Sequence, residues 1–481
     1  MKKGALWAGL IALAVVAAGA SAFLIGQLYQ SRKAAEEPAD EIKTFAAWTN
    51  HEQLSQVPAM IVKGVQIGKA VDVGAGNCMI DMNGATAEDY TAYLALLQEQ
   101  GFELLADNGT DGINAEVFTA NLKKDEISVA AIYVTRLDKV YVIAGRNQKT
   151  SQFLKYDATT TAEPVVEQTM MALCELRSHG NSFVFRLKNG HFLVNDGGEN
   201  FDFIYLIEYL ESFMPEGEKP VIDCWIISHA HSDHMGVFYE LGTHPEYAER
   251  LIVNEILYSQ PNAETVDKYK ATNAVAQIYV AAGMFRTSEG TATPVIRPIT
   301  GQKYYFCDIV MEVFFSQELL PLTNYSEDLN DSSTWLMYNV EGQKILLAGD
   351  GDYGAMHYIM RMYDTSYFNL DIFINLHHGI NVFDEFTDYL TIKTLLVPYY
   401  DAGFYPVTVA NGTRWESQDR LDANEHLLAS VQEAMTGTDG TLELSFPYSV
   451  GTAKRLERNK WLHHGGEDLV GFPSEIVQQQ G

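Results

Sequence analysis

The chain has 481 residues and is strongly acidic, with 63 Asp and Glu against 33 Lys and Arg and a formal net charge of −30. A surface of that sign repels a long polyanion, which disfavours extended nucleic acid as a partner. The four Cys are widely spaced without a CxxC pair, which excludes a zinc ribbon or a CxxC redox motif, and their even number permits disulfides without requiring them.

The amino-terminal segment is apolar. Residues Ala5 to Tyr29 carry no charge, and at about 1.5 Å per residue such a helix spans a hydrocarbon core of about 30 Å. We therefore predict a transmembrane helix or signal over residues 1–30. Residues 31–43, which are rich in Ala and Glu, are predicted to form a poorly ordered tether.

Two features of this segment bear on localisation. Ala20-Ser21-Ala22 matches the cleavage pattern of a signal peptide, but the apolar run continues to Gly26, which favours an uncleaved anchor. Lys2 and Lys3 favour a cytoplasmic amino terminus. We expect a membrane-anchored protein whose body lies outside the cytoplasm, or a secreted protein if the segment is cleaved.

Residues 44–150 are predicted to form a small α+β domain. A helix is expected over residues 87–101 with Thr86 as its N-cap, followed by three strands. This region contains His51 as its only histidine and no carboxylates at ligand spacing, so we expect no catalysis there, and its partner is unknown. The Thr-rich residues 151–164 are predicted to be a linker.

A hairpin is predicted where the next domain begins. Strands over residues 183–188 and 191–195 flank Asn189-Gly190, a two-residue hairpin signal. The second strand runs into Asp196, which is followed by two glycines. Asp196 can orient a metal-binding imidazole by accepting the proton of its other ring nitrogen. A plain turn is the alternative.

The richest motif is His229-Ala230-His231-Ser232-Asp233-His234. It follows an apolar strand at residues 221–228 and precedes a helix predicted over residues 235–241. Imidazole nitrogens and carboxylate oxygens are the ligands that zinc-type ions prefer. On a loop, His229 and His231 can bind one ion, while Asp233 and His234 turn toward a second.

Two later strands also end on candidate ligands. The strand at residues 344–349 leads to Asp350, and the strand at residues 371–376 leads to His377 and His378. A carboxylate at Asp350 can bridge two cations and offset their repulsion. From an extended segment, two consecutive side chains point to opposite sides. We therefore expect one ligand of this pair, His378, with His377 as the alternative.

The order of these motifs resembles that of the metallo-β-lactamase superfamily over residues 165–450. The resemblance implies an α+β chain with an αββα sandwich next to the small amino-terminal α+β domain. It also implies one or two divalent ions, zinc with manganese as the alternative, and hydrolysis by a metal-bound hydroxide that Asp233 holds and orients. Asn330-Asp331-Ser332-Ser333 and residues 438–444 are similar to the ComEC-like branch and to phosphorylcholine esterases.

One departure concerns the first ion. Many superfamily members supply a third His between the HxHxDH motif and the bridging acid, but the only His in that interval here is His244, at the wrong spacing. The loop instead offers Asn330 and Ser332, either as alternative ligands or as groups that hydrogen-bond to a ligand and orient it. We therefore expect His229, His231 and Asp350 to hold this ion together with water.

The predicted function is metal-dependent hydrolysis of a small phosphodiester or related ester. A non-catalytic surface binding protein on the same scaffold is the first alternative, and a lactone or β-lactam hydrolase is the second. The aromatic-rich residues 398–405 fit either a pocket mouth or buried packing. Residues 451–481 are predicted to be a polar tail.

Overall fold

The computed structural model describes residues 52–108, 116–156, 164–176, 180–322, 329–379, 383–398, 423, 426–437 and 440–457. The predicted anchor and tether lie outside these ranges, as do most of the aromatic-rich segment and residues 458–481 of the predicted tail. Within the described ranges, no helix combines the length and the apolar character that a membrane span requires. The chain divides into two compact units, Met1–Gln148 and Lys149–Gly481.

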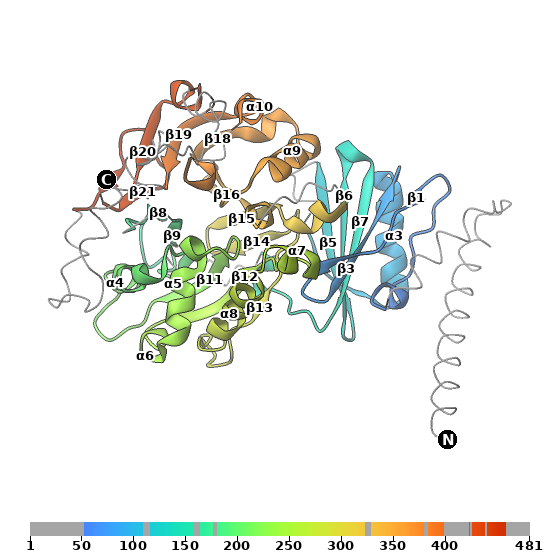
Figure 1. The fold of residues 1–481 in the computed structure, drawn as a ribbon, viewed down its shortest axis with the longest axis horizontal. Helices are drawn as coiled ribbons and strands as arrows, with labels where there is room; N and C mark the ends of the chain where they lie inside the picture. Colours follow the sequence, from blue (N-terminus) through green and yellow to red (C-terminus); the bar gives the residue numbers. More distant parts are fainter. Residues whose placement is uncertain are drawn as a thin grey trace, which may run out of the picture. The chain divides into compact units, whose positions relative to one another are not determined.

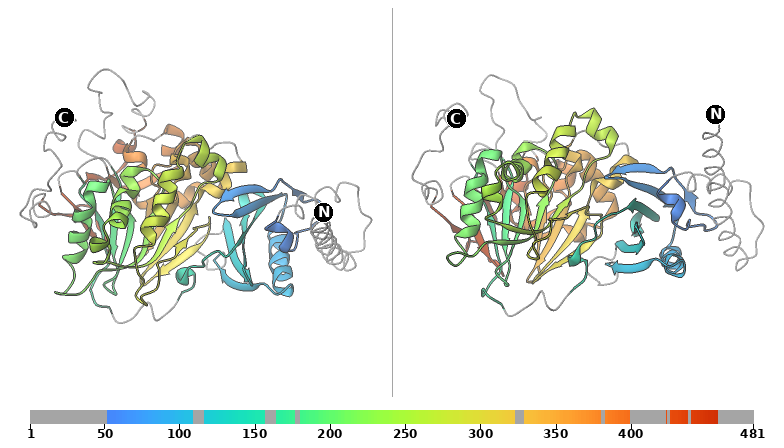
Figure 2. Two further views of the ribbon diagram at one scale, coloured as in Figure 1. Left: turned by 60° about the horizontal axis from the view of Figure 1, so that its bottom comes forward. Right: turned by 90° about the horizontal axis from the view of Figure 1, so that it is seen from below.

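The first unit is an antiparallel sheet with one long helix along one face (Figures 1 and 2). The strand order is β1-β3-β7-β6-β5-β4, and β2 pairs with β3. Helix α3 begins after Thr86 with a capping box, in which Thr86 and Asp89 each accept a backbone N–H from the other. The elements are η1 (Leu54–Gln56), β1 (Gln66–Ile67), β2 (Val71–Gly74), β3 (Asn77–Asn83), α3 (Ala87–Glu99), β4 (Glu103–Asp107), β5 (Val117–Lys124), β6 (Ile127–Val134), η2 (Thr135–Leu137) and β7 (Lys139–Arg146).

The second unit contains two mixed sheets. The eight-stranded sheet has the order β13-β12-β11-β10-β9-β8-β21-β22. Its strands are β8 (Met170–Leu173), β9 (Ser182–Arg186), β10 (Phe192–Asp196), β11 (Val221–Ile227), β12 (Ile252–Tyr258), β13 (Val295–Ile296), β21 (Leu442–Ser445) and β22 (Lys454–Arg455). The seven-stranded sheet comprises, in spatial order, β14 (Lys303–Phe306), β15 (Ile309–Phe315), β16 (Trp335–Val340), β17 (Gln343–Leu347), β18 (Asn369–Ile374), β19 (Thr391–Val397) and β20 (Glu433–Thr436).

Helices of the second unit lie on opposite sides of its strands (Figure 1). The eight-stranded sheet packs against α4 (Phe203–Glu211), α5 (Ser232–Thr243) and α8 (Thr272–Ala282). The seven-stranded sheet contacts α9 (Tyr353–Met362) and α10 (Asp384–Thr387). The remaining helical elements are η3 (Gln152–Leu154), η5 (Asn200–Asp202), α6 (Pro245–Ala248), α7 (Ala263–Lys268), η6 (Gln317–Leu322), η7 (Asn330–Ser332), η8 (Thr365–Phe368) and η9 (Leu376–Gly379).

The two sheets of the second unit face each other through aromatic and polar side chains. The rings of Phe185 and Tyr338 stack with centroids 4.7 Å apart, and the Tyr338 hydroxyl donates to Asn195 Oδ1 at 2.6 Å. On the outer faces, Trp225 packs against Phe238 of α5. The layers therefore run helix, sheet, sheet, helix, because strand residues alternate between the shared interior and the helices.

Some local structure differs from the sequence-based expectation. Helix α5 begins at Ser232, so Asp233 and His234 lie in its first turn instead of in a loop. Because an acidic side chain near a helix amino terminus is favourable, the motif itself can start the helix. The hairpin turn spans Lys188 to Gly190, where Gly190 takes a positive φ of 82°.

Two segments predicted as linker and tail join the second unit. In the predicted linker, η3 buries Phe153, whose ring centroid lies 4.6 Å from that of Phe306. In the predicted tail, β22 pairs with β21 and extends the eight-stranded sheet. The four cysteines all lie in the described ranges as buried free thiols.

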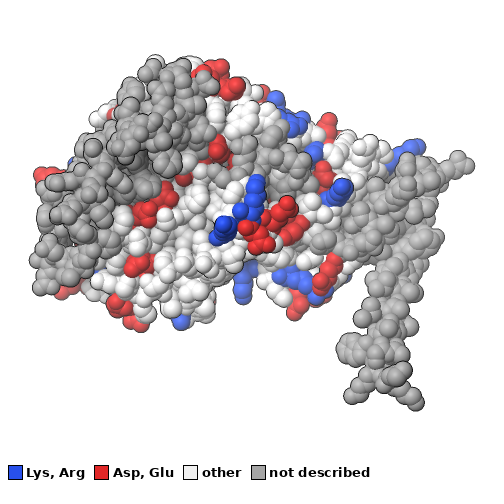
Figure 3. Space-filling model, in the orientation of Figure 1, with Lys and Arg blue, Asp and Glu red and all other residues white. Residues whose placement is uncertain are grey.

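Charged side chains of both signs share the described surface. On the face in Figure 3, Lys and Arg occur in small groups next to Asp and Glu. Exposed ion pairs such as Lys393–Asp371, at 2.6 Å, contribute at most about 1 kcal/mol. The acidic excess in the sequence therefore acts on solubility and partner choice more than on stability.

A buried carboxyl group predicts pH-dependent stability. Glu255 on β12 accepts hydrogen bonds from the Ser151 hydroxyl at 2.6 Å and from the Gln152 amide at 2.9 Å. Burial raises its pKa from 4.5 to about 7. Because the folded state holds this proton more tightly than the unfolded state, Glu255 should lower the stability of the wild type by about 3 kcal/mol as the pH rises from about 4.5 to 7.

The variant Glu255→Gln keeps an amide oxygen for Gln152 and does not titrate. We expect its free energy of unfolding to exceed that of the wild type at pH 7.5 and to approach it at pH 4.5, as measured by urea denaturation. A difference that is constant across this pH range would contradict the assignment.

Candidate metal centre

Three strand ends bring potential ligands around one carboxylate, Asp350. The loop after β11 carries His229 and His231, and the loop after β17 carries Asp350. The segment after β18 carries His377 and His378. β11 belongs to the eight-stranded sheet, while β17 and β18 belong to the other sheet. The cluster therefore forms where the ends of strands from both sheets meet.

The first group comprises His229, His231 and Asp350, whose potential ligand atoms lie within 4.8 Å of one another. Nε2 of His229 is 2.9 Å from Nδ1 of His231 and 3.8 Å from Oδ2 of Asp350. His229 is fully buried. These three side chains can bind one ion from three directions.

The second group comprises Asp233, His234, Asp350 and His378, again within 4.8 Å of one another. Nε2 of His234 lies 3.0 Å from Asp350 Oδ1 and 3.6 Å from Asp233 Oδ2. Nε2 of His378 lies 3.0 Å from the same Asp233 oxygen. Asp350 belongs to both groups, so it can bridge two ions.

Hydrogen bonds behind the cluster fix which ring nitrogens face it. Nδ1 of His234 lies 2.8 Å from Asp196 Oδ2, so Nδ1 carries the proton and Nε2 presents its lone pair to the cluster. Nδ1 of His229 lies 3.1 Å from the hydroxyl of Ser228 and 3.2 Å from that of Ser333. Its Nε2 likewise faces the group.

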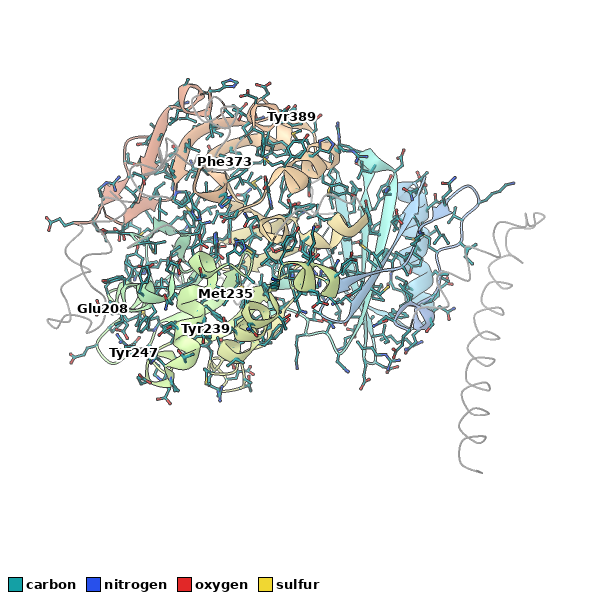
Figure 4. All side chains as sticks on the ribbon, viewed as in Figure 1. Glu208, Met235, Tyr239, Tyr247, Phe373 and Tyr389 are labelled. Carbon is teal, nitrogen blue, oxygen red and sulfur yellow. The ribbon has the colours of Figure 1, made fainter. Side chains whose placement is uncertain are left out.

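Helix α5 provides a rigid support for Asp233 and His234. Met235 is buried in the core next to them, and it lies on the same helix as Tyr239 (Figure 4). Gly236 approaches the backbone of Glu199 and Asn200 so closely that a Cβ there would lie 2.5 Å from the Asn200 nitrogen. Tight packing of this kind holds the side chains of the first turn in place.

The charges of the cluster fit a cation. Burial alone would lower the pKa of His234, but Asp350, Asp233 and Asp196 raise it well above its usual value, so without an ion these carboxylates favour a proton on Nε2 that a bound metal ion would replace. Burial also lowers the pKa of His229, which keeps that imidazole in the neutral, metal-binding form. His234 Nε2 and Asp350 Oδ1 are buried 3.0 Å apart, and neither makes a well-formed hydrogen bond to the residues that the structure describes. A divalent cation would satisfy these atoms and balance the carboxylates.

Asp196 is placed behind the cluster by an unusual backbone conformation. Its φ is 56°, and its carboxylate accepts hydrogen bonds from the backbone N–H and the hydroxyl of Ser228, both at 2.8 Å. The same carboxylate binds His234. It thus orients the strand end and the imidazole together.

The variant Asp196→Asn should therefore weaken metal binding. Loss of such an outer-shell carboxylate typically costs about 10–100-fold in metal affinity, and we expect a drop of that size in chelator competition. Asp223→Asn is the matched control, because Asp223 lies 2.8 Å from His191 Nδ1 at the opposite end of β11. Equal affinities in the wild type and Asp196→Asn would contradict the orienting role.

The alternative ligands Asn330, Ser332 and His377 lie outside both groups, as does His244. The Ser332 hydroxyl donates to the carbonyl of Leu329 at 2.5 Å within its own turn, and His244 pairs with Glu240 at 2.9 Å. Asn330 lies beside the cluster, with its Nδ2 3.5 Å from His377 Nδ1. Nε2 of His377 lies 3.5 Å from Asp350 Oδ2, and Nε2 of His378 lies 3.6 Å from Asp350 Oδ1.

Three residues next to the candidate metal centre, Ser228, Ser333 and Gly349, were not identified from the sequence as part of it. Ser228 and Ser333 hold His229, and the Ser333 hydroxyl also accepts the backbone N–H of Asp350 at 3.1 Å. Gly349 takes a φ of 54°, and a Cβ there would lie 2.9 Å from the Ser228 hydroxyl. The position of Ser228 immediately before His229 was the available sequence signal.

Comparisons with known proteins give weak likenesses. No protein-family model matches the chain, and no curated protein matches it. Among solved structures, the chain is similar to Tm1679, a metal-dependent hydrolase of the β-lactamase superfamily, at 11% identity and a TM-score of 0.33 over 58% of this chain and 100% of that one. It is also similar to the MIM-2 metallo-β-lactamase, at 11% identity and a TM-score of 0.22 over 47% of this chain and 83% of that one. The chemistry inferred below therefore depends on the geometry of the cluster itself.

Proposed function

We propose that this protein is a metal-dependent hydrolase of the metallo-β-lactamase superfamily that uses two divalent ions. The observation that carries the proposal is the position of Asp350, whose carboxylate is shared by two compact groups of His and Asp side chains. A buried carboxylate between two such groups can offset the repulsion between two neighbouring cations. A structural zinc site would instead surround one ion with four ligands.

The donor set favours zinc, with manganese as the alternative. Four imidazoles and two carboxylates contribute, and nitrogen-rich sets suit zinc while oxygen-rich sets suit manganese. When bound, the ions would lower the pKa of a coordinated water to about 7 and polarise an ester or phosphoryl oxygen.

Asp233 is the residue best placed to handle the proton of the attacking water. Its side chain is 13% exposed, whereas that of Asp350 is 1% exposed, so Asp233 can meet both solvent and the cluster. One of its oxygens faces His234 and His378. The carboxylate can thus contribute to metal binding while it orients the attacking water and accepts its proton.

The proposed substrate is a small phosphodiester or a related ester. Two neighbouring cations suit phosphoryl transfer, because they stabilise both the attacking and the leaving oxygen. The net charge of −30 disfavours extended nucleic acid. The proposed likeness to ComEC-like proteins and phosphorylcholine esterases draws support from the Asn330–Ser332 turn, which lies next to the cluster.

The proposal can be tested on the purified full-length chain. Metal analysis should find about two ions per chain. A hydrolysis screen should then detect cleavage of bis-nitrophenyl phosphate or a phosphorylcholine ester, but not of a lactone or a chromogenic cephalosporin. Chelation should abolish activity and added Zn²⁺ or Mn²⁺ should restore it. Bound metal without any hydrolysis would instead favour the non-catalytic binding protein.

We also propose that residues 1–30 anchor the protein in a membrane with its body outside the cytoplasm. The support is the uncharged apolar run from Ala5 to Tyr29 together with Lys2 and Lys3 before it. Full-length protein should then fractionate with membranes and be accessible to protease from outside an intact cell. Recovery of all the protein in the cytoplasmic fraction would contradict this proposal.

A further inference from the structure

The carboxylate of Asp350 divides the imidazoles of the cluster into two pairs. Its Oδ1 lies 3.0 Å from His234 Nε2 and 3.6 Å from His378 Nε2. Its Oδ2 lies 3.5 Å from His377 Nε2 and 3.8 Å from His229 Nε2. Each oxygen therefore has two ring nitrogens within 3.8 Å, and the oxygen nearest His377 is the one that His229 also approaches, although His377 belongs to neither compact group.

This division bears on the smaller of the two groups. The group around Oδ1 has four potential ligands, whereas the group around Oδ2 has three, His229, His231 and Asp350. The chain between His234 and Asp350 supplies no third imidazole, because its only histidine, His244, pairs with Glu240. His377 approaches the smaller group through the Asp350 oxygen that His229 also faces.

The backbone explains how two consecutive histidines can face one carboxylate. In an extended segment their side chains would point to opposite sides. Here His377 and His378 have φ values of 46° and 55°, so the chain turns sharply between them. The His377 N–H donates to the Gly349 carbonyl at 3.1 Å, which ties this turn to the Asp350 loop. Two adjacent left-handed non-glycine residues are costly, and such strain persists where the surroundings enforce it.

A neighbouring amide can set the tautomer of His377. Its Nδ1 lies 3.5 Å from the Asn330 side-chain amide. The two ends of an amide are interchangeable by a flip. The amide nitrogen faces His377 here, and a flip that turned the oxygen toward the ring would let Asn330 accept a hydrogen bond from Nδ1–H and leave the Nε2 lone pair directed at Asp350. The His377 side chain is 24% exposed, which leaves it open to an incoming ion.

We infer that His377 is the third imidazole ligand of the first metal ion, so that His229, His231, His377 and Asp350 hold one ion and Asp233, His234, His378 and Asp350 hold the other. The inference rests on the proposed two-metal function. It replaces the expectation that water completes the coordination of the first ion. It also assigns the two adjacent histidines, His377 and His378, to different ions.

The test is metal binding by full-length His377→Gly. Glycine removes the imidazole and adopts a positive φ without strain, so the turn is kept. His244→Gly is the control, because His244 is the only other histidine between the HxHxDH motif and His377, apart from His357, that could be tested as a ligand of the first ion. His378→Gly is the corresponding variant for the second ion. After chelation, each protein is reloaded with Co²⁺ or Zn²⁺ and titrated with a competing chelator, with metal content and the Co²⁺ absorption spectrum as readouts.

The expected result is that His377→Gly loses one ion or binds it at least about 10-fold more weakly, while the other ion keeps its affinity. His244→Gly should match the wild type. If His377→Gly bound two ions with wild-type affinity and spectrum, the inference would be overturned while the proposed function stands. Loss of both ions from His377→Gly would also overturn the inference. A wild type that binds no ion under any condition would overturn the proposed function itself. Circular dichroism of the metal-free variants checks that the fold is retained.

Discussion

Asp350→Ala is expected to abolish hydrolysis by removing the one ligand that both ions share. Its carboxylate is 1% exposed and faces imidazoles from each side. Loss of only an outer-shell partner already costs about 10–100-fold in metal affinity, so loss of the shared ligand should exceed that for each ion. Metal analysis should find neither ion at stoichiometric levels, and turnover should fall by more than about 100-fold.

A neighbouring carboxylate provides the control for this variant. Asp352 lies two residues further along, caps α9 by accepting the Tyr353 N–H at 2.7 Å, and is outside both ligand groups. Asp352→Ala should cost about 1 kcal/mol of stability through the lost cap and leave both ions bound. If Asp350→Ala retained two ions, the bridging position of Asp350 would be wrong.

Asp233→Ala is expected to lower turnover by about 10²–10⁴-fold, the range for loss of a positioned proton acceptor. The reduction has two parts, because Asp233 also contributes an oxygen to the group of His234 and His378. We therefore expect weaker binding of that ion and retention of the other. Metal titration and steady-state kinetics at saturating Zn²⁺ separate the two parts.

The fold should survive this change. Asp233 lies in the first turn of α5, where an acidic side chain stabilises a helix by about 0.3–1 kcal/mol. Ser232→Ala, one residue earlier, is the control, and its thermal unfolding and activity should stay close to those of the wild type. Wild-type turnover in Asp233→Ala would exclude the catalytic role proposed for this carboxylate.

The sequence indicated which segments could bring ligands together, because each is a short apolar strand that ends on His or Asp. The strand before His229 and the strand before Asp350 follow from local composition alone. The same holds for α3 in the first unit, whose Thr86 cap and 3.6-residue periodicity are local signals. The order of strands within each sheet depends on contacts between distant residues, which local patterns do not encode.

Other parts of the metal centre depend on tertiary geometry. The pairing of Asp196 with His234, rather than with another histidine, depends on how β10 and β11 lie beside each other. The Ser333 contact with His229 joins a residue just before β16 to one just after β11, strands of different sheets. The left-handed turn at His377 and His378 was not foreseen, because non-glycine residues rarely adopt a positive φ and the neighbouring glycine, Gly379, comes only after both of them.

The origin of the ligands in two sheets has a consequence for folding. His229 and His234 follow the eight-stranded sheet, whereas Asp350 and His378 follow the seven-stranded one. Each of the two proposed ions would take ligands from both sheets, so it would link the two sheets and would find its full ligand set only after they had packed together. Metal supply would then affect the stability of the native state as well as its chemistry, because one ion at a free concentration 100 times its Kd adds about 2.7 kcal/mol to the free energy of unfolding.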